Sequence, residues 1–367
     1  MKVIVLGTRG IPNIQGGVET HCQELYPRLV KLGADVTVIT RKPYVDDLKQ
    51  IEYKGVKLKH IFAPKKKSLE AIIHTFLGVL YAKKENPDIL HIHAIGPSIM
   101  VPFAKLLGLK IVVTNHGPDY DRQKWGKLAK FILQLGEKSG TIYADRVIVI
   151  SEVIKSIQEE KYKRYDCDLI FNGVNIPRKS TSIDYIRSLN LEPEKYIIAV
   201  GRFVEEKGFH DLIEAYRQLD SDIKLVLVGD ADHETTYSKN LKQLAKKNGI
   251  ILTGFIKGEK LSQIFSHAKL FVMPSYHEGL PIALLEAMSY NLDVLVSNIP
   301  ANLNVKLKNN DYFEVGNIVD LQNKLLSKLN SSIRRNFKEI IKNKYNWDEI
   351  ANRTLNVYSL TKLLVKS

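Results

Sequence analysis

Short apolar runs alternate along the chain with longer segments in which apolar residues recur every three to four positions. The first run covers 3–6, and a segment with helical spacing follows at about 18–32. Further apolar runs in the first half cover 36–40, 55–62, 89–93, 111–114, 147–151 and 168–171, with helical spacing at about 69–84. Parallel strands need long crossover connections, which are usually helices, so this alternation predicts a parallel sheet flanked by helices.

The same alternation restarts after a polar stretch at 177–194. Apolar runs cover 196–200, 224–228, 250–253, 270–273 and 294–296, and helical spacing appears at about 209–219, 236–248, 260–266, 281–289 and 347–364. A chain of 367 residues is too long for one ordinary hydrophobic core. We therefore predict two α/β domains with doubly wound parallel sheets, joined near 172–195.

The composition is that of a globular protein, with 44% hydrophobic and 26% charged residues. Cys22 and Cys167 form no spacing motif, which excludes a disulfide framework and favours a reducing, intracellular compartment. No apolar run reaches the roughly 18 residues of a membrane-spanning helix. The first apolar run breaks at Gly7, so we interpret it as a buried strand rather than a signal peptide and expect a soluble, cytoplasmic protein.

The formal net charge is +14, and the excess of basic residues leans toward the N-terminal half. A basic surface suits nucleic acid, an anionic membrane or phosphorylated substrates. The sequence contains no aromatic–basic RNA motif and no zinc-binding spacing. The charge therefore favours a phosphorylated substrate or a membrane surface, and we expect no nucleic acid as a partner.

Candidate chemistry lies in the turns after the strands, because ligands of open parallel sheets bind beyond the carboxyl ends of the strands. Two glycine clusters, Gly7 with Gly10 and Gly16 with Gly17, follow the first apolar run and precede a helix. Glycines let backbone amides approach a phosphate, and a helix N-terminus favours the anion. The spacing is not that of a GxGxxG dinucleotide fingerprint. These clusters indicate either a phosphate-binding turn or an ordinary glycine loop.

Two cations follow the first strand of the second half. Gly201 and Arg202 come directly after 196–200, and Lys207 comes five residues later. A nucleoside diphosphate needs such partners, with arginine acting as a planar fork and lysine as a point charge. The alternative is a pair of solvated loop charges. Because both cations stand at the carboxyl end of one strand, an anion-binding role is favoured.

The most specific segment is 274–288, where a strand ends, a glycine turn follows and a helix begins. Glu278 precedes the helix and Glu286 lies eight residues on, about two helical turns, so we expect both carboxylates on roughly the same side. Carboxylates accept hydrogen bonds from sugar and ribose hydroxyls. The backbone amides of Gly279 and Leu280 can meet an anion. The alternative is a helix cap with a surface glutamate.

Histidines also stand at strand ends. His116 follows 111–114 and precedes a glycine, a position that favours a ligand site, although a lone histidine is more often structural. His91 and His93 share one face of a strand, which would suit a pair of metal ligands. The sequence shows no third ligand cluster. We therefore expect these two side chains to pack near the strand end and predict no metal site.

Together these residues resemble the large family of retaining, nucleotide-sugar-dependent glycosyltransferases classed as family 4. The Glu278…Glu286 segment looks like that family's E-x7-E motif, and Arg202 with Lys207 looks like its diphosphate-binding pair. The resemblance spans almost the whole chain and its motifs are highly specific.

The resemblance implies the GT-B fold, in which two Rossmann-like domains face a central cleft. The N-terminal, acceptor-side domain would cover 1–172, and the closing helix, within 347–367, would cross back onto it. The nucleotide-sugar-binding domain would cover 173–346. The expected reaction is transfer of a hexose from a nucleoside-diphosphate sugar with retention at the anomeric carbon.

The family's roles fall on four residues of the second domain. Arg202 and Lys207 would bind the donor diphosphate and stabilise the leaving group. Glu286 would hold ribose hydroxyls, and Glu278 would hold the transferring sugar. No metal and no other cofactor would be required, because the two cations neutralise the departing phosphate.

Further roles fall on both domains. Gly16 and Gly17 would approach the donor phosphates, and His116 would line the reacting face of the donor sugar. Gly254 and Ile256, after the run at 250–253, would lie near the nucleobase. The catalytic residues would thus be His116, Arg202, Lys207 and Glu278. The donor would also be contacted by the glycines, Ile256, Leu280 and Glu286.

The N-terminal half narrows the resemblance. Segments 7–12, 16–20 and 116–126 look like a bacterial subgroup that contains rhamnosyltransferases of surface-polysaccharide assembly. That subgroup usually has an acidic–tryptophan step where this chain has Asp119 and Tyr120. The sugar would be rhamnose or another hexose, and the acceptor a glycan or a polyprenyl-diphosphate-linked saccharide.

An apolar helix flanked by lysines suggests where such an acceptor is met. Lysines at 65–67 lead into the helical segment 69–84, and Lys124, Lys127 and Lys130 extend the basic character. This segment would rest on the anionic inner face of the plasma membrane, as a peripheral attachment, or would pack in the core with solvated ends. The sequence leaves both alternatives open.

Two other functions remain open from the sequence. A GT-B nucleotide-sugar 2-epimerase would release free nucleotide and altered sugar without an acceptor, but the Glu278…Glu286 segment disfavours it. A non-catalytic protein that binds sugar nucleotides need not keep Arg202, Lys207 and both glutamates, so their presence disfavours that class. Turnover of a donor separates the three classes.

Overall fold

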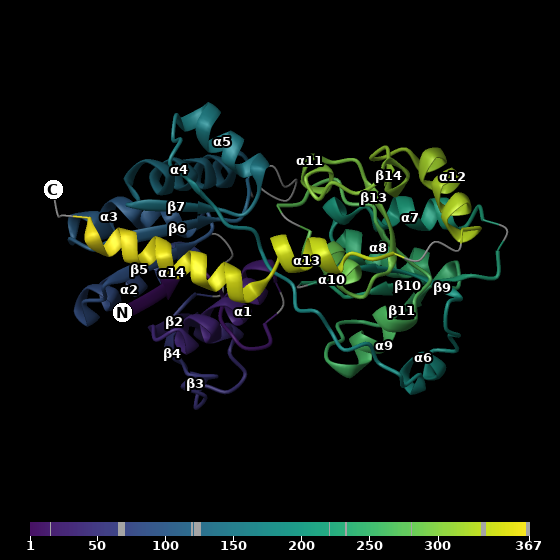
Figure 1. Ribbon diagram of the computed structural model, residues 1–367, viewed down its shortest axis with the longest axis horizontal. Helices are drawn as coiled ribbons and strands as arrows, with labels where there is room; N and C mark the ends of the chain where they lie inside the picture. The colour runs from purple at the N-terminus through teal and green to yellow at the C-terminus, as the bar shows by residue number, and fades with distance from the viewer. Residues whose placement is uncertain are drawn as a thin grey trace. The chain divides into compact units, whose positions relative to one another are not determined.

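The computed structural model describes residues 1–14, 16–64, 70–118, 120, 126–219, 221–231, 233–279, 281–331 and 335–364. The chain forms two compact units (Figure 1). The first comprises Met1–Gly173 and Asn346–Ser367, and the second comprises Val174–Tyr345. Each junction lies one residue from the boundary expected from the sequence. Gly173 belongs to the first unit, where it packs against the ring of Trp347.

Within the described residues, the first unit is built on an eight-stranded sheet in the order β3-β4-β2-β1-β5-β6-β7-β8. Its strands are parallel except for the β3–β4 pair, which forms an antiparallel edge. The bounds are β1 (Lys2–Leu6), β2 (Asp35–Arg41), β3 (Glu52–Tyr53), β4 (Val56–Ile61), β5 (Ile89–His93), β6 (Ile111–Asn115), β7 (Arg146–Val149) and β8 (Asp168–Leu169). The central strands are buried along their length, which explains why they read as continuous apolar runs.

Helices cover this sheet and include the C-terminal helix. They are α1 (Gly17–Lys31), α2 (Glu70–Glu85), α3 (Val101–Leu106), α4 (Lys127–Tyr143), α5 (Glu152–Tyr162) and α14 (Trp347–Leu363), with single turns at η1 (Lys42–Tyr44) and η2 (Pro97–Met100). Helix α14 packs alongside α1, and its Ile350 and Tyr358 share one buried core with Val3 and Leu25 (Figure 1). The expected return of the closing helix to the N-terminal domain is confirmed.

The described part of the second unit is a six-stranded parallel sheet in the order β11-β10-β9-β12-β13-β14. Its strands are β9 (Tyr196–Val200), β10 (Lys224–Val228), β11 (Ile251–Leu252), β12 (Leu270–Met273), β13 (Asp293–Ser297) and β14 (Tyr312–Phe313). Its helices are α6 (Asp184–Ser188), α7 (Phe209–Tyr216), α8 (Thr236–Lys247), α9 (Glu259–His267), α10 (Ile282–Ser289), α11 (Pro300–Leu303), α12 (Ile318–Leu329) and α13 (Lys338–Lys344), with turns at η4 (Glu205–Lys207) and η5 (Asn309–Asp311). The polar stretch at 177–194, near the expected junction of the two domains, contains a short helix, α6.

Each sheet has a point at which the strand order reverses. In the first unit, β1 lies between β2 and β5, so the chain winds outward in both directions from β1 and β5. In the second unit, β9 lies between β10 and β12. Crevices outside the carboxyl ends of strands form at such switch points. The loops after β1, β5, β9 and β12 are therefore where a ligand site is expected.

Among the described residues, no helix combines the length and the apolar character needed to cross a membrane.

Candidate functional site

The loops after β9 and β12 are packed together at the switch point of the second unit. Gly208 ends the η4 turn with φ +64°, and a Cβ atom there would lie 2.1 Å from the carbonyl oxygen of Pro274. The backbone N–H of Tyr276 donates to the carbonyl of Glu206 over 2.9 Å. Only glycine fits this contact without moving one of the loops. The close approach fixes the segment that carries Lys207 against the segment that carries Glu278.

These two residues form an ion pair. Nζ of Lys207 lies 2.5 Å from Oε1 of Glu278, and the side chains are only 17% and 10% exposed. The Ser275 hydroxyl donates to the same carboxylate oxygen over 2.7 Å. Burial would raise the pKa of the Glu278 carboxyl, but the charge and hydrogen bond of Lys207, together with the Ser275 hydroxyl, hold the pKa below its ordinary value. The structure thus places an ionised carboxylate and a cation side by side at the strand ends.

The β12–α10 loop is anchored by a tyrosine that the sequence motifs did not single out. The Tyr276 hydroxyl donates to Oδ2 of Asp211 in α7 over 2.5 Å, and its ring stacks on His210 with centroids 6.1 Å apart. Burial and the Asp211 carboxylate raise the pKa of Tyr276 to about 12. Tyrosine and aspartate lie 65 residues apart in sequence, so no local pattern indicates their contact.

The glycines of the second unit allow three backbone segments to approach one another. A Cβ atom at Gly229, after β10, would lie 2.0 Å from the carbonyl oxygen of Gly201. Gly229 also forms a backbone bridge with Gly254. Arg202 is partly exposed beside Gly201, and Ile256 is half-buried two residues after Gly254. The structure therefore brings Gly201 and Gly254 to one edge of the sheet, as expected for residues around a common ligand.

One expectation about the glutamates is corrected. Helix α10 begins at Ile282, so Glu278 lies in the preceding loop and Glu286 within the helix. The argument that two helical turns place both carboxylates on one side does not apply, because the first of them is not helical. Glu286 is half-buried in α10, Gly279 is partly exposed, and Leu280 lies outside the described residues.

In the first unit, Gly16 and Gly17 stand at the start of α1. Gly16 is the residue before the helix, with φ +151°, and a Cβ atom there would lie 2.0 Å from Oε2 of Glu19 and 2.5 Å from Arg9. Arg9 and Glu19 are paired over 3.2 Å, and the backbone N–H of Arg9 donates to the same glutamate. An acidic side chain therefore already lies at the N-terminus of α1, next to the glycines expected to approach phosphate.

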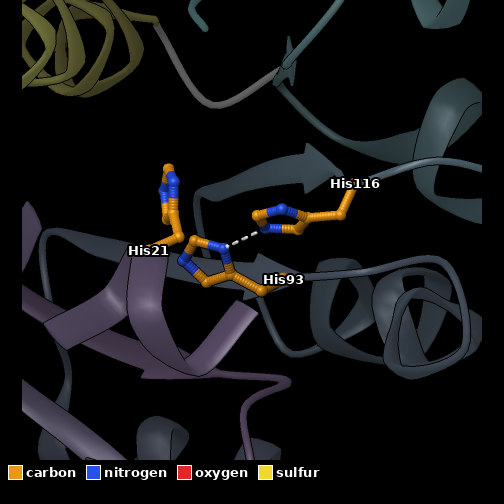
Figure 2. A group of neighbouring side chains, drawn as sticks. All are labelled: His21, His93 and His116. Carbon is orange, nitrogen blue, oxygen red and sulfur yellow. Dashed lines mark hydrogen bonds between the residues drawn. The ribbon is translucent and has the colours of Figure 1, made fainter. Parts of the chain in front are cut away.

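Three histidines gather near the switch point of the first unit. Figure 2 shows His21 rising from α1, His93 at the end of β5 and His116 after β6. Nδ1 of His93 lies 2.9 Å from Nε2 of His116, and the His21 ring meets both edge-on with centroids 5.4 and 5.0 Å away. Nδ1 of His21 lies 2.6 Å from Oδ1 of Asn172, so it carries the proton that the amide oxygen accepts.

The sequence showed no third ligand cluster beside His91 and His93, but the fold brings two further histidines to them. His91 stacks on His93 with ring centroids 4.2 Å apart, and His21 and His116 complete the cluster from outside the strand. Burial lowers the pKa of His21 to about 4, against the opposing hydrogen bond to Asn172. Burial, with the neighbouring His21, lowers the pKa of His91 to about 3. Burial and the surrounding imidazoles hold the pKa of His93 and of His116 well below the ordinary value, so these rings are neutral at physiological pH.

His21, His93 and His116 are the described residues best placed to hold a metal ion, with one ligand atom each within 4.8 Å of one another. Two nitrogens bound to one zinc ion are at most about 4.2 Å apart. Both nitrogens of His93 are also engaged, by the hydroxyl of Tyr26 and by His116. As it stands, the arrangement is a hydrogen-bonded cluster of neutral rings.

The chain belongs to the family described as Glycosyl transferases group 1, which matches residues 150–351, and its N-terminal half matches Glycosyltransferase Family 4 over residues 15–178. The protein is therefore a glycosyltransferase. An uncharacterized glycosyltransferase of Methanocaldococcus jannaschii is 26% identical, with 98% of each chain covered. A Bacillus subtilis glycosyltransferase named for teichuronic acid biosynthesis is 27% identical over 77% of this chain and 76% of its own.

Solved structures show the same architecture. Sucrose-phosphate synthase from Thermosynechococcus elongatus superposes with a TM-score of 0.82 at 21% identity, covering 98% of each chain. HepE from Anabaena, in complex with UDP and glucose, gives a TM-score of 0.81 at 18% identity, covering 98% of this chain and 100% of its own. With two Rossmann-like parallel-sheet units and these neighbours, the fold is GT-B.

Proposed function

We propose that this glycosyltransferase moves a hexose from a nucleoside-diphosphate sugar to a saccharide acceptor with retention at the anomeric carbon. The observation that carries the proposal is the Lys207–Glu278 ion pair at the switch point of the second unit. A cation suited to a diphosphate and a carboxylate suited to sugar hydroxyls are adjacent there, as a donor of that chemistry requires. The structural likeness to HepE, solved with UDP and glucose, supports this choice of donor class.

In this proposal the second unit binds the donor. Arg202 and Lys207 contact the diphosphate, Glu278 accepts from hydroxyls of the transferring sugar, and Glu286 accepts from the ribose. The backbone amides of Gly279 and Leu280 meet the anion, and Gly201 lets the backbone approach it. Gly254 and Ile256 lie beside the nucleobase.

The first unit contributes the remaining contacts. Gly16 and Gly17 approach the phosphates through their backbone amides, and His116 contacts the sugar at its reacting face. A neutral imidazole suits that position because it offers one donor and one acceptor to sugar hydroxyls.

The chemistry needs a stabilised leaving group and a proton acceptor. The bond between the anomeric carbon and the diphosphate oxygen breaks, and its electron pair stays on the phosphate. The acceptor oxygen attacks from the same face, and its proton passes to the departing phosphate oxygen. Charge grows on the phosphate in the transition state, where Arg202 and Lys207 stabilise it electrostatically. No metal is required, because these two cations supply the compensating charge.

The double variant Arg202→Ala and Lys207→Ala tests the donor assignment. With a donor and acceptor pair that the wild type turns over, we expect turnover to fall at least 100-fold, the order of loss seen when one preorganised electrostatic group is removed. The pair Lys224→Ala and Lys239→Ala, on the exposed surface of the same unit, matches much of the change in charge and should leave turnover unchanged. Undiminished turnover in the first variant would overturn the phosphate assignment.

We further propose a role in building cell-surface polysaccharide, with rhamnose or another hexose as the sugar and a lipid-linked saccharide as the acceptor. The sequence resemblance of segments 7–12, 16–20 and 116–126 supports this, and one curated relative is named for teichuronic acid biosynthesis. Incubating the protein with a panel of nucleotide sugars and a polyprenyl-diphosphate-linked saccharide tests it. Release of altered free sugar without acceptor would indicate an epimerase instead.

We place a peripheral membrane contact on the first unit. The N-terminal part of α4 exposes Leu128, Phe131 and Leu135 to 74%, 61% and 42%, and their spacing puts them on one side of the helix. Lys127 and Lys130 stand beside them. Apolar side chains flanked by lysines suit an anionic bilayer. We propose that this face of α4 binds the inner face of the plasma membrane. A polyprenyl-linked acceptor would be reached there.

The segment for which the sequence left membrane contact and core packing both open is α2, which buries His74, Gly78 and Val79 and leaves Phe76 and Leu80 about two-fifths exposed. It is therefore largely a core helix, and the lysines at 65–67 lie outside the described residues, as does Lys124. Liposome flotation with anionic vesicles separates the alternatives. Replacing Leu128, Phe131 and Leu135 by serine should abolish flotation, whereas the matched control Leu303→Ser, Val319→Ser and Leu326→Ser should not. Unchanged flotation of the α4 variant would contradict a membrane contact at α4. Unchanged flotation after charge reversal of the lysines at 65–67 would contradict a membrane contact at that segment.

A further inference from the structure

A buried chain of hydroxyl and imidazole groups leads to His116 from the interior of the first unit. It begins at Thr114, whose Oγ1 lies 2.7 Å from Nε2 of His91. Nδ1 of His91 lies 2.6 Å from the hydroxyl of Tyr358 and 3.0 Å from that of Tyr26. The Tyr26 hydroxyl is also hydrogen-bonded to Nε2 of His93. These residues are at most 1% exposed, so water does not compete for the links.

The last link reaches the partly exposed His116. Nδ1 of His93 lies 2.9 Å from Nε2 of His116, and Figure 2 shows the two rings joined by this contact. The His21 ring packs edge-on against them. Its Nδ1 is hydrogen-bonded to Asn172, so His21 packs beside the chain of hydrogen bonds without forming a link in it.

Each imidazole in the chain carries a single ring proton. Burial and neighbouring imidazoles hold the pKa of His93 and of His116 well below the ordinary value, so both rings are neutral. A neutral imidazole donates from one nitrogen and accepts at the other. Across each ring, the direction of the hydrogen bond at one nitrogen therefore dictates the direction at the other.

Two arrangements satisfy these rules, and each fixes the state of His116. If the Tyr26 hydroxyl donates to Nε2 of His93, then Nδ1–H of His93 donates to Nε2 of His116, and the proton of His116 is on Nδ1. If Nε2–H of His93 donates to the Tyr26 oxygen, then Nδ1 of His93 accepts from Nε2–H of His116, and Nδ1 of His116 keeps its lone pair. In both, Nε2 of His116 is held by His93, and Nδ1, which has no hydrogen-bond partner among the described residues, is the atom for a ligand.

We propose that Tyr26 and His93 are positioning residues that fix one tautomer of His116 and hold its ring, and so decide whether His116 offers the donor sugar a proton or a lone pair. The consequence for the sugar rests on the proposed function of His116. The tautomer itself is a property of the protein without ligand, so the two can be tested apart.

Two-bond proton–nitrogen NMR correlations on protein labelled with 15N-histidine report the tautomer directly, with His116 assigned from its loss in His116→Gln. We expect one tautomer in the wild type and a mixture or the opposite tautomer in Tyr26→Phe. Tyr162→Phe is the control, because it removes a hydroxyl of the same unit that is hydrogen-bonded to Glu137 and lies outside this chain of hydrogen bonds. It should leave the tautomer of His116 unchanged. If the His116 resonances of Tyr26→Phe match those of the wild type, the positioning role is wrong.

Turnover supplies the second readout. We expect Tyr26→Phe to lower kcat by about 10- to 100-fold, the order of one hydrogen bond to the sugar left unmade, with little change in the KM for the donor. In a His116→Ala background, Tyr26→Phe should have no further effect, because the chain then ends before the sugar. A shifted tautomer with wild-type kcat would uphold the positioning role and remove His116 from the proposed reaction. An unshifted tautomer refutes the positioning role whatever the turnover.

Discussion

Lys207 and Glu278, both proposed as donor ligands, are bound to each other over 2.5 Å. The carboxylate neutralises the ammonium group, and the Ser275 hydroxyl holds the carboxylate in place. When a donor binds, Lys207 must therefore exchange its contact with Glu278 for one with the phosphates. Glu278 can then accept hydrogen bonds from the sugar hydroxyls. The nucleotide part and the sugar part of one donor thus act on opposite members of one ion pair.

Replacing Glu278 by glutamine separates these two effects. Without the competing carboxylate, Lys207 is available to phosphate, so we expect the affinity for a nucleoside diphosphate to rise about 3- to 10-fold, since a largely buried cation left without its partner favours an incoming anion. Turnover of the full donor should fall at least 10-fold, because a charged acceptor for the sugar hydroxyl is lost. Calorimetry and a turnover assay check both expectations.

The control for this charge change is Glu339→Gln, an exposed site on α13 of the same unit. It should alter neither affinity nor turnover. A weaker diphosphate affinity in Glu278→Gln would show that the carboxylate orders Lys207 for phosphate instead of competing for it.

Gly208 offers a test of how tightly the two donor loops are packed. Gly208 and Gly249 have nearly the same backbone, φ +64° and +65°, but a Cβ atom at Gly208 meets the Pro274 carbonyl at 2.1 Å whereas Gly249 faces open space. Gly249→Ala should lower the free energy of unfolding by about 1–2 kcal/mol from left-handed strain alone. Gly208→Ala should cost about 1–3 kcal/mol more, because the loop must move.

Gly208→Ala should also weaken nucleotide binding, whereas Gly249→Ala should not, because only the first displaces the loop that carries Lys207. Denaturant unfolding and calorimetry on both variants provide the measurements. Equal losses of stability in the two variants would argue against the close approach of the loops.

The buried histidines predict a loss of stability in acid. The pKa of His21 is lowered to about 4 and that of His91 to about 3, against about 6.5 in an unfolded chain. Between these values the unfolded state binds more protons, so stability is fully present above about pH 6.5 and is lost as the pH falls toward 4 and below. One pKa unit corresponds to about 1.4 kcal/mol, so the full loss for one such histidine is about 3–5 kcal/mol.

His21→Leu removes one of these groups and should flatten the dependence of the unfolding free energy on pH between 6.5 and 4. Its neighbours are Asn172, His93, His116 and Trp347. His233→Leu, at an exposed position, should keep the wild-type slope. The same slope in both variants would mean that His21 titrates normally in the folded protein.

The proposed absence of a metal requirement has its own test. Turnover should persist after exhaustive dialysis against a chelator and should not be restored or raised by Mg²⁺, Mn²⁺ or Zn²⁺, because Arg202 and Lys207 carry the compensating charge. Loss of turnover with a chelator and its recovery with one ion would contradict this. The His21–His93–His116 cluster would then be the first place to look for that ion.

The architecture was largely predictable because buried parallel strands are apolar along their whole length. Strands β1, β9 and β12 fall where the sequence predicts them within one residue. The two-residue strands β3 and β14 were missed because polar residues interrupt the sequence around them, whereas the equally short β8 and β11 lie within apolar runs. Helix α6 was missed for a related reason, as Ile186 is its only buried residue among five.

Within the candidate site, local motifs were predictable and long-range partners were not. Glycine turns and cations at strand ends are local features, so Gly16, Arg202 and Lys207 could be named from the sequence. The contacts of Tyr276 with Asp211 and of Tyr26 with His93 arise only from packing. A usable clue did exist, because two histidines on a fully buried strand must find polar partners.

The measurement that tests the central claim most directly is calorimetric binding of UDP, GDP and dTDP to the wild type and to Lys207→Ala, followed by the sugar nucleotides of the preferred base. The account predicts base-selective binding that weakens at least 10-fold in the variant, because a partly buried contact between cation and phosphate is lost. Absence of binding to every nucleotide diphosphate, or equal binding in the variant, would contradict a donor site at the Lys207–Glu278 pair.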